Sequence, residues 1–197
     1  MIILDDNLLQ DLFNKRRIFY LGVNAQNSVK GIYDLIQYIK EYIELNLVVE
    51  IGSFAGVSTE LFALYFKNVI SVDIWERAIS ENNYTDIRLP YMSAGRYEFG
   101  KVLTKYSNVK LIEDFSVSAA KQCNDESIDV VYIDGDHKYA QVFADIEAWR
   151  AKVKKGGFMS GHDYSNHSNI GVKKAVDEIF GKPQMVFNDT SWCVRVK

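Results

Sequence analysis

Short apolar runs alternate with segments of helical spacing along most of the chain. In the helical segments, apolar side chains recur at every third or fourth residue, as in helices that bury one face. The runs between them are continuous, as is typical of strands buried on both faces of a parallel sheet. The predicted helices are residues 29–44 (capped by Asn27 or Ser28), 57–67, 116–123, 138–153 and 172–180, and the predicted strands are residues 47–51, 69–73, 109–113, 128–134, 158–160, 185–187 and 192–196.

The order of these elements predicts an α/β fold. Strands that alternate with helices form crossover units, which give a mostly parallel sheet with helices on both faces. Only the turn at residues 188–190 separates the last two strands, so they should pair antiparallel. We therefore predict a doubly wound, seven-stranded sheet that is mostly parallel and has an antiparallel last strand.

The chain is long enough for one domain with a sizeable core. It has 197 residues, of which 48% are apolar, so we expect a single domain over residues 1–197 with an N-terminal helical segment at 1–45. Residues 75–107 are longer than a minimal connection and mix aromatic with basic side chains. This segment is either a lid over a binding site or an ordinary amphipathic helix after a loop.

Charge and cysteine usage narrow the partners and the compartment. The net charge is −3 and no long block of like charge occurs, so double-stranded nucleic acid is not an expected partner. No stretch approaches the ~20 apolar residues of a membrane span. Cys123 and Cys193 lie far apart, and acidic residues follow the first few positions in place of a secretory signal. We expect a cytoplasmic protein, and homo-oligomerisation is left open.

A glycine-containing turn follows the strand at residues 47–51. Gly52 and Gly56 permit a tight turn and close approach of a ligand, and the next helix offers free N–H groups. Asp73 ends the second strand about 20 residues later, where an acid can accept both hydroxyls of a ribose. We therefore predict that Glu50, Gly52, Ser53, Gly56 and Asp73 bind or support a nucleoside-containing cofactor.

NAD and S-adenosylmethionine both fit this outline. A dinucleotide site requires Gly-x-Gly-x-x-Gly to seat the pyrophosphate, whereas this turn has only Gly52 and Gly56, and the side chains of residues 53–55 would crowd a diphosphate. S-adenosylmethionine is therefore favoured. An NAD-linked oxidoreductase and a non-catalytic interaction domain are kept as alternatives.

Acids and histidines cluster after two consecutive strands. Asp134, Asp136 and His137 follow one strand, and His162 and Asp163 follow the next. Because the ends of consecutive parallel strands lie at one edge of the sheet, these side chains should converge. Carboxylates and imidazoles can bind a divalent cation, and one of them could be a general base. A purely structural interpretation, in which these residues order strand ends and turns, stays open.

The glycine turn resembles the first motif of the class I S-adenosylmethionine-dependent methyltransferases, acid-x-Gly-x-x-x-Gly, and the resemblance runs from about residue 45 to the end of the chain. It implies a Rossmann-like sheet and S-adenosylmethionine as cofactor. It also implies that Asp73 holds the ribose and that Asp114 and Phe115 flank the adenine. Phe115 as a plain core aromatic is an equally simple interpretation.

The sequences Asp-Gly-Asp-His at 134–137 and Gly-His-Asp-Tyr at 161–164 resemble the subgroup of these enzymes that methylates hydroxyls of sugars and natural products, some with a divalent metal. The resemblance implies that Asp134, His162 and Asp163 bind Mg²⁺ or Mn²⁺, with Asp134 also close to the cofactor. Asp136 or His137 would be the base. His162 departs from the subgroup, which has an acid there, and this puts magnesium in doubt.

These observations predict an enzyme that transfers a methyl group from S-adenosylmethionine to a hydroxyl oxygen of a small molecule. A sugar or a glycosylated metabolite is the expected acceptor. The shape of the pocket formed by residues 75–107 would decide which acceptor binds, and the sequence does not name it.

Overall fold

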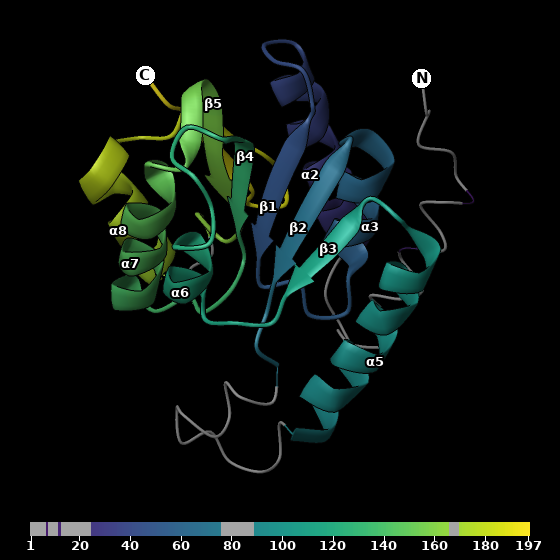
Figure 1. Ribbon diagram of the computed structural model, residues 1–197. Coiled ribbons are helices and arrows are strands. Elements are labelled where there is room, and N and C mark those ends of the chain that lie inside the picture. The colour runs from purple at the N-terminus through teal and green to yellow at the C-terminus, as the bar shows by residue number, and fades with distance from the viewer. Residues whose placement is uncertain (1–6, 8–11, 13–24, 76–88, 166–169) are drawn as a thin grey trace.

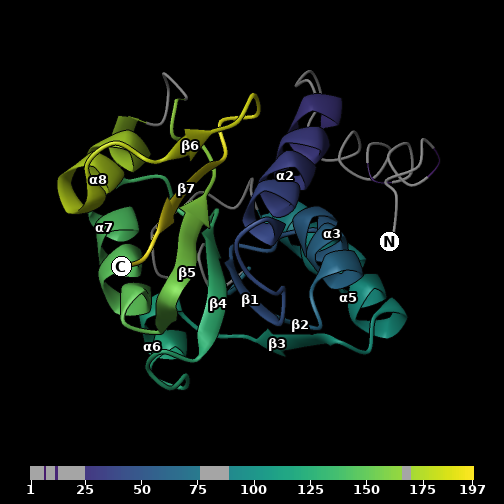
Figure 2. The ribbon, with the colours of Figure 1, turned by 90° about the horizontal axis from the view of Figure 1, so that it is seen from above.

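The computed structural model describes residues 7, 12, 25–75, 89–165 and 170–197. Its centre is a seven-stranded sheet with the order β3-β2-β1-β4-β5-β7-β6. Figure 1 labels β1 to β5, and Figure 2 also labels β6 and β7. Strands β1 to β5 pair in parallel, and β7 pairs antiparallel with both β5 and β6. The predicted sheet is confirmed, including its antiparallel end. The strands are β1 (Leu47–Ile51), β2 (Asn68–Val72), β3 (Val109–Ile112), β4 (Ile128–Ile133), β5 (Val153–Gly161), β6 (Met185–Val186) and β7 (Trp192–Arg195).

Helices cover both faces of this sheet, as Figure 2 shows: α2, α3 and α5 lie on one face, and α6, α7 and α8 lie on the other. Successive residues of the central strands enter opposite cores. Val48 and Val130 join the core under the first three helices, and Val49 and Val131 join the other. The helices are α2 (Ala25–Lys40), α3 (Val57–Tyr65), α5 (Leu89–Lys105), α6 (Ser116–Ala120), α7 (Tyr139–Arg150) and α8 (Ile170–Phe180).

The strand order reverses between β1 and β4. The chain passes from β1 outward to β2 and β3, and then crosses to β4 on the other side of β1. At this point the carboxyl ends of two strands lie side by side, because Ile51 pairs with Ile133 and the Asp134 N–H donates to the Ile51 carbonyl at 2.8 Å. Ligands of open α/β sheets bind in the crevice at such a reversal. The fold therefore positions the residues that follow β1 and β4 for binding.

Two local predictions were wrong. Helix α2 begins at Ala25, so Asn27 and Ser28 lie inside the helix and neither is its cap. The sequence predicts a helix over residues 138–153, but α7 ends at Arg150. Strand β5 already begins at Val153, and Gly156 and Gly157 lie inside it. Here the pairing register with β4 shifts between Ile128 and Val130, and glycines suit such an irregular strand.

The segment at residues 75–107 is partly described. Its second half is the regular helix α5, as one of the two interpretations expected. Residues 76–88 lie outside the described residues, so the prediction of a lid there is not tested. Among the helices that are described, none is both long enough and apolar enough to cross a bilayer.

Candidate active site

The glycine turn after β1 packs directly against the end of β4. Gly52 has a φ of 87°, and a Cβ atom there would lie 2.3 Å from the carbonyl oxygen of Asp134. Gly56 has a φ of 77°, and its Cβ would lie 2.8 Å from the Cγ2 of Val102 in α5. Both conformations disfavour residues with a side chain. The protein's own packing therefore requires both predicted glycines, Gly52 against the acidic end of β4 and Gly56 against α5.

Glu50, near the end of β1, stabilises this turn through hydrogen bonds. Its side chain is completely buried, and its carboxylate accepts hydrogen bonds from the hydroxyls of Ser53 at 2.8 Å, of Ser71 at 3.3 Å, and of Ser58 and Thr59. Burial raises the pKa of Glu50 to about 7, although the bonds from the hydroxyls of Ser58, Thr59 and Ser53 oppose the shift. Glu50 and Ser53 thus bond to each other and hold the shape of the turn, which connects β1 to α3.

This buried carboxyl makes stability depend on pH. The fold raises the pKa of Glu50 from 4.5 to about 7, so its protonated form contributes stability that is full below pH 4.5 and is lost as the pH rises through about 7. Across this window we expect the free energy of unfolding to fall by about 3 kcal/mol more in the natural protein than in Glu50→Gln. Denaturant titrations of both proteins measure this difference. If the free energy of unfolding changes with pH equally in both proteins, the prediction is wrong.

Asp73 follows β2 and lies beside the same turn. Its carboxylate accepts hydrogen bonds from the backbone N–H groups of Phe54 at 2.8 Å, Ile74 at 2.7 Å and Trp75 at 2.9 Å. Burial raises its pKa, and these N–H groups lower it in part. The structure therefore brings Asp73 to the predicted cofactor turn and gives it a second task, which is to hold the backbone of the turn at Phe54. Its contact with a ribose stays a prediction.

Aromatic side chains cover the turn from the side of α5. Phe54 stacks on Tyr91 with ring centroids 4.8 Å apart, and its ring lies so close to Gly95 that a Cβ there would be 2.5 Å from Cε2. Trp75 donates from Nε1 to the carbonyl of Phe54 at 2.9 Å and packs on Phe99. Sequence reasoning did not assign these contacts, although the aromatic content of residues 75–107 was a signal that could have found them.

Asp114 and Phe115 lie between β3 and α6. The Asp114 carboxylate accepts the Phe115 N–H at 2.8 Å and a longer hydrogen bond of 3.4 Å from the amide of Gln122. Phe115 is half-buried and belongs to neither hydrophobic core of the described chain, which argues against a plain core role. Both residues follow a parallel strand at the edge where the glycine turn lies, as an adenine site requires.

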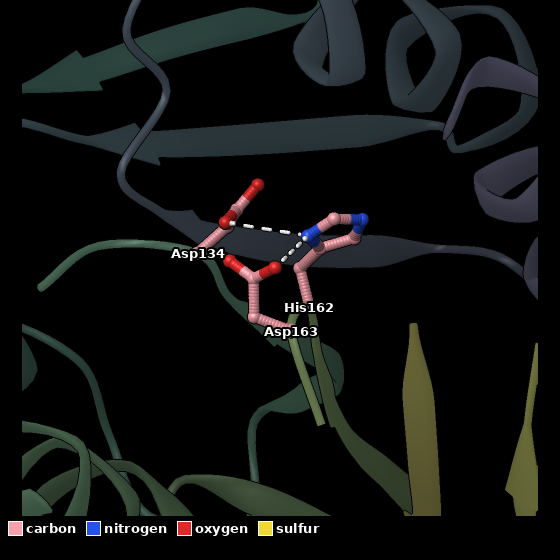
Figure 3. Close-up of side chains that lie close together, drawn as sticks. All are labelled: Asp134, His162 and Asp163. Carbon is pink, nitrogen blue, oxygen red and sulfur yellow. Dashed lines mark ion pairs between the residues drawn. The ribbon is translucent and has the colours of Figure 1, made fainter. Parts of the chain in front are cut away.

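Asp134, His162 and Asp163 converge after β4 and β5 (Figure 3). The pairing of Ile133 with Gly161 aligns the two strand ends. Nδ1 of His162 lies 3.3 Å from Oδ1 of Asp163 and 4.0 Å from Oδ1 of Asp134. One ligand atom from each residue lies within 4.8 Å of the others, which suits a single divalent cation. The predicted cluster is therefore brought together.

His137 belongs to this cluster, whereas Asp136 lies at its edge. Nε2 of His137 is 2.9 Å from Oδ2 of Asp163 and 3.6 Å from Oδ1 of Asp134. These two carboxylates, Asp134 first, raise the pKa of His137 to about 10. Asp136 accepts the N–H of Lys138 at 2.9 Å, and its other oxygen lies 3.4 Å from the Lys138 ammonium. The two candidate bases therefore have different surroundings.

The cluster has a further acid that sequence reasoning missed. Burial lowers the pKa of His162, but nearby carboxylates, that of Asp134 first, outweigh it and raise the pKa overall. One of these carboxylates is Asp189, whose Oδ2 lies 3.7 Å from Nε2 of His162. Asp189 stands in the turn between β6 and β7, and its local sequence is typical of a turn.

Comparison with known proteins gives the family of this chain. A family model described as a methyltransferase domain matches residues 49–164, which include the glycine turn, Asp73 and the acid–histidine cluster. The uncharacterized protein R132 of Acanthamoeba polyphaga mimivirus is 30% identical over 125 residues, 60% of this chain and 52% of that protein. The chain thus spans about half the length of this curated relative.

Solved structures share the fold. CalS11, a TDP-rhamnose 3'-O-methyltransferase of calicheamicin biosynthesis, aligns over 98% of this chain and 97% of its own, with 14% identity and a TM-score of 0.59. The O-methyltransferase NovP aligns over 87% and 80%, with 16% identity and a TM-score of 0.65. At such low identity this likeness concerns the fold alone. Because the family model covers more than half of the sequence, the chain belongs to the methyltransferase domain family.

Proposed function

We propose that this protein transfers the methyl group of S-adenosylmethionine to a hydroxyl oxygen of a small molecule, a sugar or a glycosylated metabolite. The observation that carries the proposal is the contact between Gly52 and the backbone of Asp134, which gives the cofactor turn and the acid–histidine cluster a common edge. Family membership supports methyl transfer. CalS11, a TDP-rhamnose 3'-O-methyltransferase, supports a sugar hydroxyl as the acceptor, and NovP, an O-methyltransferase, supports oxygen as the acceptor atom.

In this proposal the turn holds the cofactor at the carboxyl end of β1. Gly52, Ser53 and Gly56 shape the turn, Asp73 accepts the ribose hydroxyls, and Asp114 with Phe115 borders the adenine. S-adenosylmethionine, when bound, supplies an electrophilic methyl group for in-line displacement by the acceptor oxygen. The protein's task is then to align the two reactants and to accept the hydroxyl proton.

Asp134, His162 and Asp163 would hold a divalent cation beside the cofactor. Their donor atoms fit one ion, and a cation there would orient the acceptor hydroxyl and lower its pKa. Imidazole nitrogen suits Mn²⁺ and the later transition metals better than Mg²⁺, which prefers oxygen ligands. We therefore favour Mn²⁺ over Mg²⁺ for this site.

Asp136 or His137 would take the proton from the acceptor. His137 lies against Asp163, and in the protein without a cation its raised pKa keeps it protonated at neutral pH. His137 can act as a base only when a bound cation, in place of the protonated imidazole, balances the negative charges of Asp134 and Asp163. Asp136 is the other candidate, and its carboxylate lies at the edge of the cluster beside Lys138.

Residues 75–107 would form the cover over the acceptor. The described half of this segment, α5, already contacts the cofactor turn through Tyr91 and Gly95. Lids that close over an active site exclude water and complete the site.

Cys123 and Cys193 both carry free thiols, which supports the cytoplasmic location proposed for this enzyme.

The cofactor assignment is tested by binding. S-adenosylhomocysteine, and not NADH, should raise the melting temperature of the protein. In calorimetry Asp73→Ala should weaken binding of S-adenosylhomocysteine by about 1–3 kcal/mol, because it loses charge-assisted hydrogen bonds.

Asp129→Ala is the matched control. This buried acid accepts the Leu47 N–H at 2.8 Å and pairs with Lys154 at 2.7 Å, at the opposite ends of the strands. It should lose stability and keep its affinity for the cofactor product. Unchanged affinity in Asp73→Ala would remove the ribose assignment, and stabilisation by NADH alone would overturn the proposed function.

A further inference from the structure

Asp189 is a buried acid that no part of the proposed chemistry yet uses. Its side chain is fully enclosed, and Oδ1 accepts the Ser191 N–H at 3.0 Å while Oδ2 accepts the Ser191 hydroxyl at 2.8 Å. Helix α2 closes over it at Gly31, where a Cβ atom would lie 2.0 Å from Cγ of Asp189. The carboxylate is therefore held in one position by its own turn and by the backbone of a helix.

The sheet directs this carboxylate at His162. Strand β7 runs antiparallel to β5, and Gly161 pairs with Trp192, so the turn before β7 returns to the end of β5. Oδ2 of Asp189 lies 3.7 Å from Nε2 of His162, a buried nitrogen that neither donates nor accepts a hydrogen bond among the described residues. The other ring nitrogen, Nδ1, faces Asp163 and Asp134. The imidazole of His162 thus lies between Asp189 on its Nε2 side and the two acids Asp134 and Asp163 on its Nδ1 side.

We propose that Asp189 is the positioning residue of His162. Its carboxylate keeps a proton on Nε2, so the lone pair of Nδ1 is free to bind a divalent cation together with Asp134 and Asp163. A carboxylate behind a histidine ligand also fixes the orientation of the ring and strengthens it as a ligand. This inference rests on the metal site of the proposed function and adds to it the residue that selects which ring nitrogen binds.

A purely structural role for Asp189 gives different expectations. In that account the acid serves only to form the turn through Ser191, and its loss acts on folding and not on the metal. The two accounts are separated by measuring the affinity of the metal-free full chain for Mn²⁺ by calorimetry. Melting temperature and affinity for S-adenosylhomocysteine are recorded beside it as measures of folding and of the cofactor site.

Asp189→Asn should weaken Mn²⁺ binding by roughly 10–100-fold while affinity for S-adenosylhomocysteine is kept. An amide group in place of Oδ2 donates to Nε2, which moves the ring proton to Nδ1 and blocks the ligand atom. Ser191→Ala is the matched control, because it removes the hydroxyl that bonds to Asp189 and keeps the carboxylate. It should bind Mn²⁺ nearly as well as the natural protein, and equal losses in both variants would overturn the proposal.

A second background tests whether Asp189 acts through the imidazole. In His162→Asp the ring is absent, so adding Asp189→Asn should cause no further loss of Mn²⁺ affinity. The same loss in both backgrounds would contradict a role through His162.

Should Asp189→Asn fail to fold, nitrogen NMR of the Zn²⁺-loaded natural protein tests the role of Asp189 without that variant. His162 should then show a protonated Nε2 and a metal-bound Nδ1, and the reverse assignment would overturn the inference.

These measurements distinguish a failure of the metal site from a failure of the role assigned to Asp189. If the natural protein binds no Mn²⁺, the metal site fails and this inference fails with it, while the binding of S-adenosylhomocysteine still reports on the methyltransferase assignment. If the natural protein and Asp189→Asn bind Mn²⁺ equally well, only the role of Asp189 is lost.

Discussion

Chelation of divalent metal should abolish methyl transfer by this protein, and added Mn²⁺ should restore it. In the proposed site, Asp134, His162 and Asp163 are the ligands, and the cation acts on the acceptor oxygen as charge develops in the transition state. Asp134→Asn should therefore lower kcat by about 100-fold or more and change the affinity for S-adenosylhomocysteine far less. Steady-state kinetics with titrated Mn²⁺ and Mg²⁺, with calorimetry on the same samples, measure both effects.

The metal prediction has a matched control, Asp129→Asn, and an outcome that would contradict it, which is activity in chelator. Asp129→Asn changes a buried acid at the opposite end of β4 from Asp134 and should leave the dependence on Mn²⁺ unchanged. Full activity in chelator would decide against a metal and would leave the methyltransferase assignment standing. In that case His137 or His162 alone would take the proton. Because the neighbouring carboxylates raise the pKa of His137 to about 10, His137 as the base predicts a rate that falls as the pH drops through that value.

Much of the site followed from one rule about parallel sheets. The sequence placed Gly52, Asp73, Asp134 and His162 after separate apolar runs, and strands that run in parallel bring such positions to one edge. The observed contacts of Gly52 with Asp134 and of Asp134 with His162 agree with that rule. No side-chain detail was needed to expect them, because the direction of the strands alone fixes which ends meet.

What the sequence did not reveal depends on register and on packing at a distance. Asp189 reaches His162 only because β7 pairs antiparallel with β5 at one particular register, and nothing in the local pattern of residues 188–190 specifies this. Glu50 was expected at the cofactor turn, but its enclosure by hydroxyls depends on how α3 packs over β1. A glycine after a helical segment and one inside an irregular strand look alike in sequence, so Gly156 does not indicate that β5 already begins at Val153.

Loss of the catalytic base should cost roughly 10²–10⁴-fold in the rate of methyl transfer, with folding and cofactor affinity intact. The structure leaves two candidates, and the variants Asp136→Asn and His137→Gln decide between them. Asn at 136 can still accept the Lys138 N–H that Asp136 now accepts at 2.9 Å, so the turn is kept. Lys138→Gln is the control on the same turn and should change the rate little, because the lysine has no free lone pair at neutral pH.

The pH profile identifies which residue acts. His137 as base predicts that the acidic limb of the profile, measured at saturating Mn²⁺, disappears in His137→Gln and persists in Asp136→Asn. Asp136 as base predicts that the acidic limb of the profile disappears in Asp136→Asn and persists in His137→Gln. If both variants keep more than about a tenth of the natural rate, neither is the base, and the proton must leave the acceptor through another group of the site.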